Sequence, residues 1–129
     1  DSEEVAKSVA SIIGIKEVKA EMLPNDKYNE MEKIIKNKTK GNVAFVGDGI
    51  NDSPVIALAD VGIAMGGIGA SSAIEAADIV IMTDNLTKVA QTVRLSKFTN
   101  KIIKQNLIFA LLVKIVVLEF FLTKRSGKQ

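Results

Sequence analysis

The stretch VAFVGDGINDSP, from Val43 to Pro54, decides the fold, because an apolar run is followed at once by a polar, glycine-flanked turn and then by a proline. With the preceding Asn42 the run reads NVAFVG, which has the length of a strand and is bounded by glycines. Such runs are typical of strands buried on both faces of a parallel sheet between helices. A proline is typical of the first turn of a helix. The stretch therefore predicts a buried strand, a turn that carries Asp48 and Asp52, and a helix.

Two helical patterns precede this stretch. The first has Ser2 as its cap and stops at Gly14, and the second opens at Pro24 and ends near Gly41. Between them lies a short apolar segment, VKAEML at residues 18–23, which is a candidate strand.

The patterns that follow the stretch also alternate. VGIAMG at 61–66 is typical of a strand, ASSAIEAA at 70–77 of a short helix, and DIVIM at 78–82 of another strand. Strands that alternate with helices across short turns predict a doubly wound α/β sheet. In such sheets ligands bind at the carboxyl ends of the strands, which is where Asp48 lies.

Composition limits the chemistry of any site. The chain has 129 residues, of which 47% are hydrophobic and 25% charged, so a disordered class is excluded. Its net charge of +2 is too small to indicate a nucleic-acid partner, and we expect none. It contains neither cysteine nor histidine, which excludes thiolate and imidazole metal sites and histidine-based triads. A bound metal should therefore be a hard cation on oxygen ligands.

The turn after the predicted strand suits a phosphate group and a cation. Gly47 and Gly49 allow backbone angles that residues with a side chain resist, so we expect a sharp turn that brings backbone amides close to an anion. Asp48 offers a hard oxygen to a cation such as Mg²⁺, and the positive end of the following helix favours a phosphate. Asp52 either binds metal or holds the loop through hydrogen bonds. A plain polar turn is the alternative, and the buried strand before it and Pro54 after it argue against that reading.

Several motifs carry a family resemblance. GDGIND followed by SPVIALADVGIAMG resembles the hinge motif of P-type ATPases, members of the haloacid dehalogenase-like superfamily. MLPNDK, AIEAADIVIMTDNLTKV and RLSKFTNKIIKQNLIFALLVK are similar to the heavy-metal branch that exports zinc, cadmium and lead. The match runs from residue 1 to about residue 118. It implies a partial haloacid dehalogenase-like (Rossmann-type) sheet followed by a long helix that enters the membrane.

The resemblance also implies roles for individual residues. Asp48 would bind Mg²⁺, while Asn51 and Asp52 would hold the loop and contact phosphate together with the Gly49 backbone. Lys27 of LPNDK would neutralise the phosphoryl group; by itself it would be read as a solvated surface lysine. Asp1 matches the last residue of a further phosphate-contacting motif. The implied cofactors are Mg²⁺ and ATP, with ATP held by a nucleotide-binding domain that this sequence does not contain.

One departure from the family pattern limits what the chain does alone. The family's nucleophilic aspartate lies in a DKTGT motif, and this sequence has no such motif. Without that aspartate no phosphoenzyme forms, so we expect the isolated chain to be inactive and to depend on the remainder of an ATPase chain. The alternatives are a soluble haloacid dehalogenase-like phosphatase and an inactive module that binds Mg²⁺ and phosphate.

The C-terminal part predicts contact with a membrane. Residues 107–122 are apolar except for Lys114 and Glu119, although a full span needs about 20 residues. A buried or partner-binding helix is the alternative. The resemblance implies the first membrane helix after the phosphorylation domain, with Lys114 at the transport site for a divalent heavy-metal ion and residues 1–106 in the cytoplasm. The expected organisation is a partial phosphorylation domain, a basic connector, a membrane helix and a polar tail, at residues 1–93, 94–106, 107–123 and 124–129.

Overall fold

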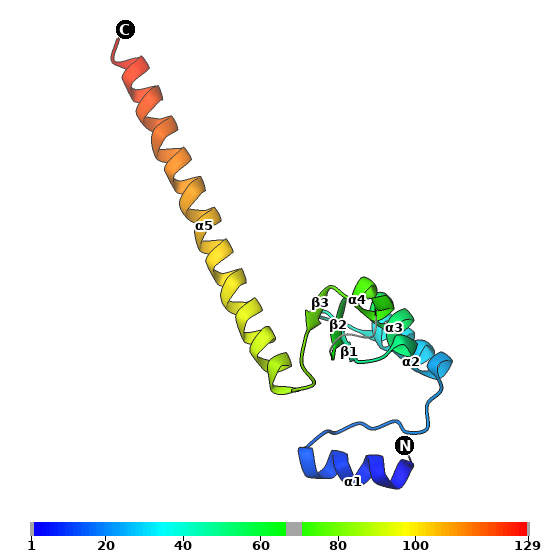
Figure 1. Ribbon diagram of the computed structural model, residues 1–129. Helices are drawn as coiled ribbons and strands as arrows, with labels where there is room; N and C mark the ends of the chain where they lie inside the picture. The colour runs from blue at the N-terminus through cyan, green and yellow to red at the C-terminus, as the bar shows by residue number, and fades with distance from the viewer. Residues whose placement is uncertain (1, 67–70, 129) are drawn as a thin grey trace. The chain divides into compact units, whose positions relative to one another are not determined.

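A computed structural model describes residues 2–66 and 71–128 of the chain (Figure 1). Two compact units are present, one ending at Asp84 and one beginning at Asn85. In chain order the elements are α1 (Glu3–Ile13), α2 (Pro24–Asn37), β1 (Ala44–Gly47), the 3-10 turn η1 (Ile50–Asp52), α3 (Ser53–Leu58), β2 (Val61–Met65), α4 (Ser71–Ala76), β3 (Ile79–Ile81) and α5 (Thr87–Ser126). The predicted α/β class, with a small parallel sheet and a long C-terminal helix, is confirmed.

The sheet has three parallel strands in the order β1-β2-β3. Ala44 lies opposite Val61 in the first pair, and Ile63 lies opposite Ile79 in the second. All carboxyl ends therefore lie at one edge of the sheet. The segments that leave this edge begin at Asp48 after β1 and at Gly66 after β2.

Local signals account for both N-terminal helices. The hydroxyl of Ser2 accepts a hydrogen bond from the Val5 N–H at 3.4 Å, and Gly14 ends α1 with φ of 79°, a conformation that glycine adopts without strain. Both predicted caps of α1 are confirmed. Pro24 occupies the first position of α2, as predicted, and the Asp26 carboxylate accepts a hydrogen bond from the Leu23 N–H at 3.0 Å.

The prediction of a strand at residues 18–23 is wrong. The structure describes the whole segment between α1 and α2, and this segment has no regular secondary structure. A strand needs a hydrogen-bonded neighbour, and the β-propensity of an apolar segment cannot supply one.

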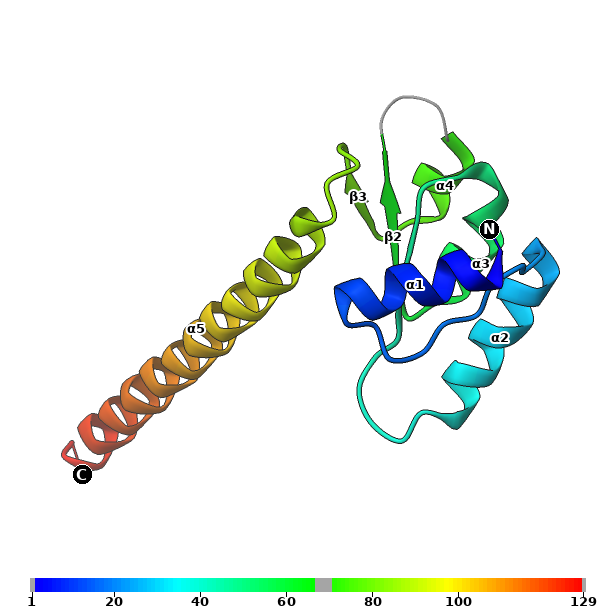
Figure 2. The ribbon, with the colours of Figure 1, turned by 90° about the horizontal axis from the view of Figure 1, so that it is seen from below.

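The core lies between the sheet and the helices that pack on it. Figures 1 and 2 show α3 and α4 side by side against the strands, with α2 next to α3. Val55 and Ile56 of α3 are the largest fully buried side chains, and burying each stabilises the fold by about 1.5–3 kcal/mol. The two buried clusters around them are formed by Met31, Val55 and Ala59, and by Ile56, Ala64 and Ala73.

Two aspartates link neighbouring strands by hydrogen bonds at their amino ends. Asp60, just before β2, accepts a hydrogen bond from the Val43 N–H at 2.8 Å, and Asp78, just before β3, accepts one from the Gly62 N–H at 2.8 Å. Each carboxylate thus ties the start of one strand to the preceding strand and sets its register. The ammonium of Lys38 also pairs with Asp60, and its hydrogen bond, with that from Val43, holds the pKa of Asp60 below its ordinary value.

Gly62 is required by a close approach between α3 and β2. A Cβ atom at this position would lie 2.3 Å from the backbone carbonyl oxygen of Ile56. Because that atom belongs to the backbone, no side-chain rotation relieves the overlap. The helix can therefore pack this closely only on a glycine.

The second unit contains one long helix. α5 runs without interruption from Thr87 to Ser126, so the predicted connector at 94–106 and the predicted membrane segment at 107–123 belong to one helix. Every described residue from Val93 onward is exposed. Among the described residues, α5 alone is long and apolar enough to cross a membrane.

Candidate functional site

The candidate site is built on the turn between β1 and α3. Gly47 ends β1, and a Cβ there would lie 2.9 Å from the Asp52 Cβ and 3.1 Å from its Oδ2. Glycine is thus needed because the Asp52 side chain packs directly on the end of the strand. The reason predicted from sequence, an unusual backbone angle, is wrong, since neither Gly47 nor Gly49 has a positive φ.

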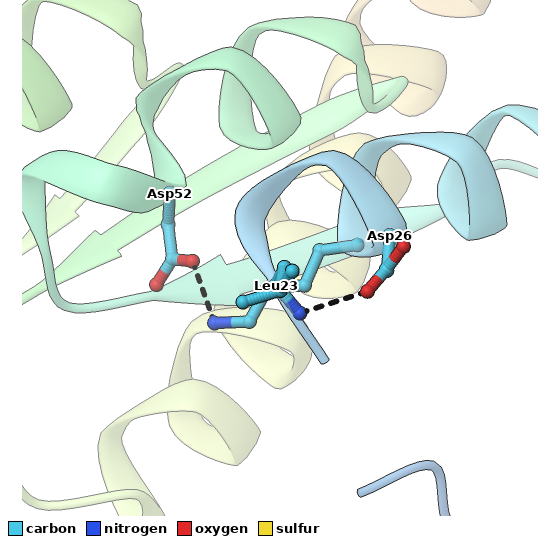
Figure 3. Close-up of polar contacts among 4 residues, drawn as sticks. Leu23, Asp26 and Asp52 are labelled. Atoms are coloured by element: carbon cyan, nitrogen blue, oxygen red, sulfur yellow. Dashed lines mark hydrogen bonds and ion pairs between the residues drawn. The ribbon is translucent and has the colours of Figure 1, made fainter. Parts of the chain in front are cut away.

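Asp52 is the buried anchor of this turn. Asp52 as a whole is 8% exposed, and it is the only buried charged residue among those that the structure describes. The Asp52 N–H donates to the Gly49 carbonyl oxygen at 3.2 Å, which closes the short 3-10 turn. Its carboxylate Oδ1 accepts a hydrogen bond from the ammonium of Lys27 at 3.0 Å (Figure 3).

Lys27 reaches Asp52 from the first turn of α2. The Lys27 side chain is 40% exposed and the Asp52 side chain 11%, so the aspartate is nearly covered while the lysine side chain is partly open. Pro24 and Asp26 define the start of α2, and they thereby fix the position of the Lys27 backbone. The structure therefore brings together two predicted site residues that lie far apart in the sequence.

Asp48 and Asn51 are both exposed. Asp48 follows β1 directly, at the carboxyl edge of the sheet, and Asn51 lies within η1. Within the described ranges neither side chain makes a hydrogen bond or ion pair, and both remain open to a ligand. Gly49 is half-buried, and Asp1 lies outside the described residues.

The side chains present fit Mg²⁺ only if phosphate oxygens and waters complete its coordination. Across residues 2–66 and 71–128, no group of three or more acidic side chains is arranged to hold a metal ion. Mg²⁺ in phosphate-handling sites is typically held by one or two carboxylates, by waters and by phosphate oxygens. The exposed carboxylate of Asp48 suits that role. The second predicted metal ligand, Asp52, is engaged with Lys27 through one oxygen.

Sequence reasoning missed two contacts near the site. The Ser53 hydroxyl lies 3.2 Å from the Ser72 hydroxyl and links the start of α3 to α4. Asp84, after β3, reaches the end of β2, since a Cβ on Gly66 would lie 3.1 Å from its Oδ1. The position of Asp84 after a strand of the parallel sheet was the available signal.

A cavity of about 280 Å³ adjoins Lys27. Met31, Ile34 and Phe45 form its apolar wall. Lys19 and Glu30, which also line the cavity, form an ion pair, and the hydrogen bond from Lys19 holds the pKa of Glu30 below its ordinary value. Lys27 thus lies between a buried carboxylate and an open, mostly apolar hollow.

Comparisons with known proteins identify the family of the chain. The family model of haloacid dehalogenase-like hydrolases matches residues 3–93. A zinc-transporting ATPase of Synechocystis sp. (strain ATCC 27184 / PCC 6803 / Kazusa) is 53% identical over 88% of this chain and 16% of its own length. A cadmium, zinc and cobalt-transporting ATPase of Bacillus subtilis (strain 168) is 49% identical over 92% of this chain and 17% of its own length.

Solved structures give the same result. A zinc-transporting PIB-type ATPase in an E2.Pi state superposes with a TM-score of 0.70 and 37% identity, covering 82% of this chain and 17% of its own. The catalytic domain of the CPx-ATPase CopB-B superposes with a TM-score of 0.56 and 36% identity, over 63% of this chain and 31% of its own. The chain thus spans about one sixth of the length of the curated relatives given above.

Proposed function

The chain belongs to the haloacid dehalogenase-like hydrolase family, and from this premise we propose that it supplies the Mg²⁺- and phosphate-holding half of the phosphorylation site of an ATP-driven heavy-metal pump. The observation that carries the proposal is the Lys27–Asp52 pair at the turn after β1. The metal-transporting ATPases among its relatives give the class of pump.

The geometry suits phosphoryl transfer, which depends mainly on positioning and on charge stabilisation. Asp52 holds the Lys27 ammonium in place by a 3.0 Å hydrogen bond, and because an ammonium has three N–H donors, the partly exposed lysine can donate another hydrogen bond to a phosphoryl oxygen. The Asn51 amide and the Gly49 N–H are further donors, and Asp1 would add a contact at the same phosphate. Asp48 would hold Mg²⁺, which when bound neutralises charge on the phosphoryl oxygens.

Other parts of the reaction require residues that this sequence does not contain. It has no DKTGT motif, so the aspartate that accepts the phosphoryl group would come from the remainder of an ATPase chain. ATP would be held by that remainder as well. The isolated chain would then be inactive, with Lys27, Asp48, Asn51 and Asp52 acting only in the assembled site.

The second unit would enter the membrane. Lys104 and Lys124 flank the apolar part of α5, and they are separated by about 30 Å along a helix, which equals the thickness of a hydrocarbon core. Lys114 lies midway between them, where a charged side chain is costly and is usually functional. We therefore place Lys114 beside the pathway of the transported divalent metal ion.

The alternative of a soluble phosphatase is less well supported. The apolar residues of α5 are exposed over its whole membrane-like segment, which a soluble enzyme would have to cover. The relatives at 53% and 49% identity are both metal-transporting ATPases.

A chimera tests the proposal. In the Synechocystis zinc-transporting ATPase, the segment that aligns with this chain would be replaced by the chain's own residues. We expect zinc-stimulated ATP hydrolysis and an acid-stable phosphoenzyme. In the chimera, Asp48→Asn and Lys27→Met should each lower hydrolysis by about 10²–10³-fold or more, since 10²–10³-fold is the range seen for loss of one hydrogen-bond donor to a transition-state oxyanion.

Matched variants serve as controls. Glu4→Gln and Lys33→Met make the same changes of charge on exposed helix positions and should leave hydrolysis unchanged. An assembled chimera without zinc-stimulated hydrolysis, or one that retains full activity with Asp48→Asn, contradicts the proposal.

A further inference from the structure

The first half of α5 carries a basic face that the proposed phosphorylation site does not use. Arg94, Lys97, Lys101 and Lys104 fall within an arc of about 80° at 100° per residue. No acidic residue occurs between Thr87 and Glu119 of the same helix. The positive charge of this face is therefore not balanced along the helix.

These four side chains are also free of internal counter-ions. All of them are exposed, and none takes part in an ion pair within the part of the chain that the structure describes. An unbalanced cationic face attracts a polyanion from outside the chain.

The basic face leads directly into the apolar segment that begins at Leu107. At about 1.5 Å per residue, Lys104 lies about 5 Å and Lys101 about 9 Å before that segment, while Lys97 and Arg94 lie about 15 and 20 Å before it. The headgroup layer of one leaflet is about 5–8 Å thick. Lys104 therefore lies within the headgroup layer, and Lys101 lies at its outer boundary, within reach of a long side chain.

We propose that this basic face binds anionic phospholipid headgroups in the leaflet where the apolar segment of α5 begins. The inference rests on the membrane entry stated under the proposed function. Lys104 and Lys101 contact lipid phosphates. Lys97 lies about 7–10 Å beyond the headgroup layer and acts across about one Debye length of 8–10 Å, whereas Arg94 lies farther away and contributes less. Clusters of four or more basic residues beside a membrane helix have this property in general.

A lipid surface fits better than a nucleic acid. The basic residues follow one another along the helix up to an apolar segment, and a nucleic-acid duplex would leave that apolar segment without a partner. On the adjoining side of the same helix Leu95, Phe98 and Ile102 are exposed apolar residues, which suit an interface between water and acyl chains.

The experiment uses lipid-selective fluorescence quenching of the whole chain in vesicles. The sequence contains no tryptophan, so Phe109→Trp introduces a single reporter beside the start of the apolar segment. Vesicles contain phosphatidylcholine and phosphatidylglycerol at a 7:3 ratio, with bromine atoms on the acyl chains of one lipid or the other. Quenching per mole of brominated lipid then reports which lipid lies next to the helix.

We expect phosphatidylglycerol to be preferred about fivefold or more, because one lysine near an anionic surface contributes about a fivefold preference. The preference should fall to near equality in 1 M salt, where the Debye length is about 3 Å. Replacing Lys97, Lys101 and Lys104 by glutamine should abolish it. Lys16, Lys33 and Lys40 are exposed lysines outside α5, and their triple replacement, with the same change of charge, should leave it intact.

The other outcomes overturn the inference in distinguishable ways. Equal quenching by both lipids leaves membrane entry standing and refutes lipid selection by the basic face. An equal loss of preference in both triple variants refutes the assignment to this face. Absence of quenching by either lipid refutes membrane entry and this inference together. Displacement from anionic lipid by an equal charge concentration of duplex DNA would show a general polyanion surface instead.

Discussion

The Lys27–Asp52 pair should contribute measurable coupling energy to the stability of the first unit. Two unit charges 3.0 Å apart attract by about 5 kcal/mol at an effective dielectric constant of about 20, before the loss of hydration is subtracted. Exposed pairs contribute about 0–1 kcal/mol, and breaking a buried pair costs about 3–5 kcal/mol. With side chains 40% and 11% exposed, this pair is intermediate, and we expect a coupling energy of about 1–2 kcal/mol.

A double-mutant cycle with Lys27→Met and Asp52→Asn measures this energy. Lys27→Met should destabilise the wild-type unit more than it destabilises the Asp52→Asn variant. Only in the wild type does the substitution leave a covered carboxylate unpaired. The assay is urea unfolding followed by tyrosine fluorescence, since the single tyrosine, Tyr28, lies in α2 and reports the first unit without interference from α5.

An exposed pair provides the comparison. Glu32 and Lys36 are 3.4 Å apart on the surface of α2, with side chains 45% and 70% exposed. Their cycle, with Glu32→Gln and Lys36→Met, should give about 0.3–0.5 kcal/mol. If the Lys27–Asp52 coupling is no larger than that, the interpretation of Asp52 as a buried anchor for the lysine is refuted.

Three further predictions concern the sheet and the isolated chain. Gly62→Ala should destabilise the first unit by about 1–3 kcal/mol through overlap with the Ile56 carbonyl oxygen, and an unchanged urea midpoint would argue against the close approach of α3 and β2. Because the hydrogen bond from Lys38 lowers the pKa of Asp60 in the folded state, its stabilisation should be complete above the ordinary aspartate pKa of about 4 and lost as the pH falls through the lower folded value. Asp60→Asn should therefore reduce the loss of stability between pH 5 and pH 2, which urea midpoints at each pH would show. The isolated chain should hydrolyse neither ATP nor phosphate esters, and turnover that Asp48→Ala abolishes would contradict this.

Local signals were enough to predict most of the elements. Ser2 and Gly14 bound the first helix because a side-chain cap and a left-handed glycine act within a few residues. The strand after Val43 was predicted because its apolar run is bounded by glycines. The apolar pattern at 18–23 also predicts a strand, but none forms there. Whether a strand forms depends on a neighbouring strand elsewhere in the chain, which a local pattern does not reveal.

The candidate site also has features that local sequence predicts and features that depend on contacts between distant segments. The residue pattern alone predicts Asp48 and Asp52 as site residues, because a parallel strand places its following turn at the ligand-binding edge. Lys27 is predicted only through the family resemblance, since no spacing rule connects the start of α2 with the turn after β1, where the structure pairs Lys27 with Asp52. The role of Gly47 was also non-local, because the atom that excludes a side chain there belongs to Asp52.

Charge at the turn explains why a cation and a phosphate would bind together. Asp48 and Asp52 carry two negative charges and Lys27 one positive charge, so this group of three has an excess of one negative charge. A phosphate dianion brought to this group alone would meet net repulsion, even with another N–H of the ammonium directed to it. A divalent cation on the exposed Asp48 carboxylate reverses the sign of the local charge. The pairing of Lys27 with Asp52 thus orients the lysine, and in the proposed half-site phosphate affinity would depend on the cation.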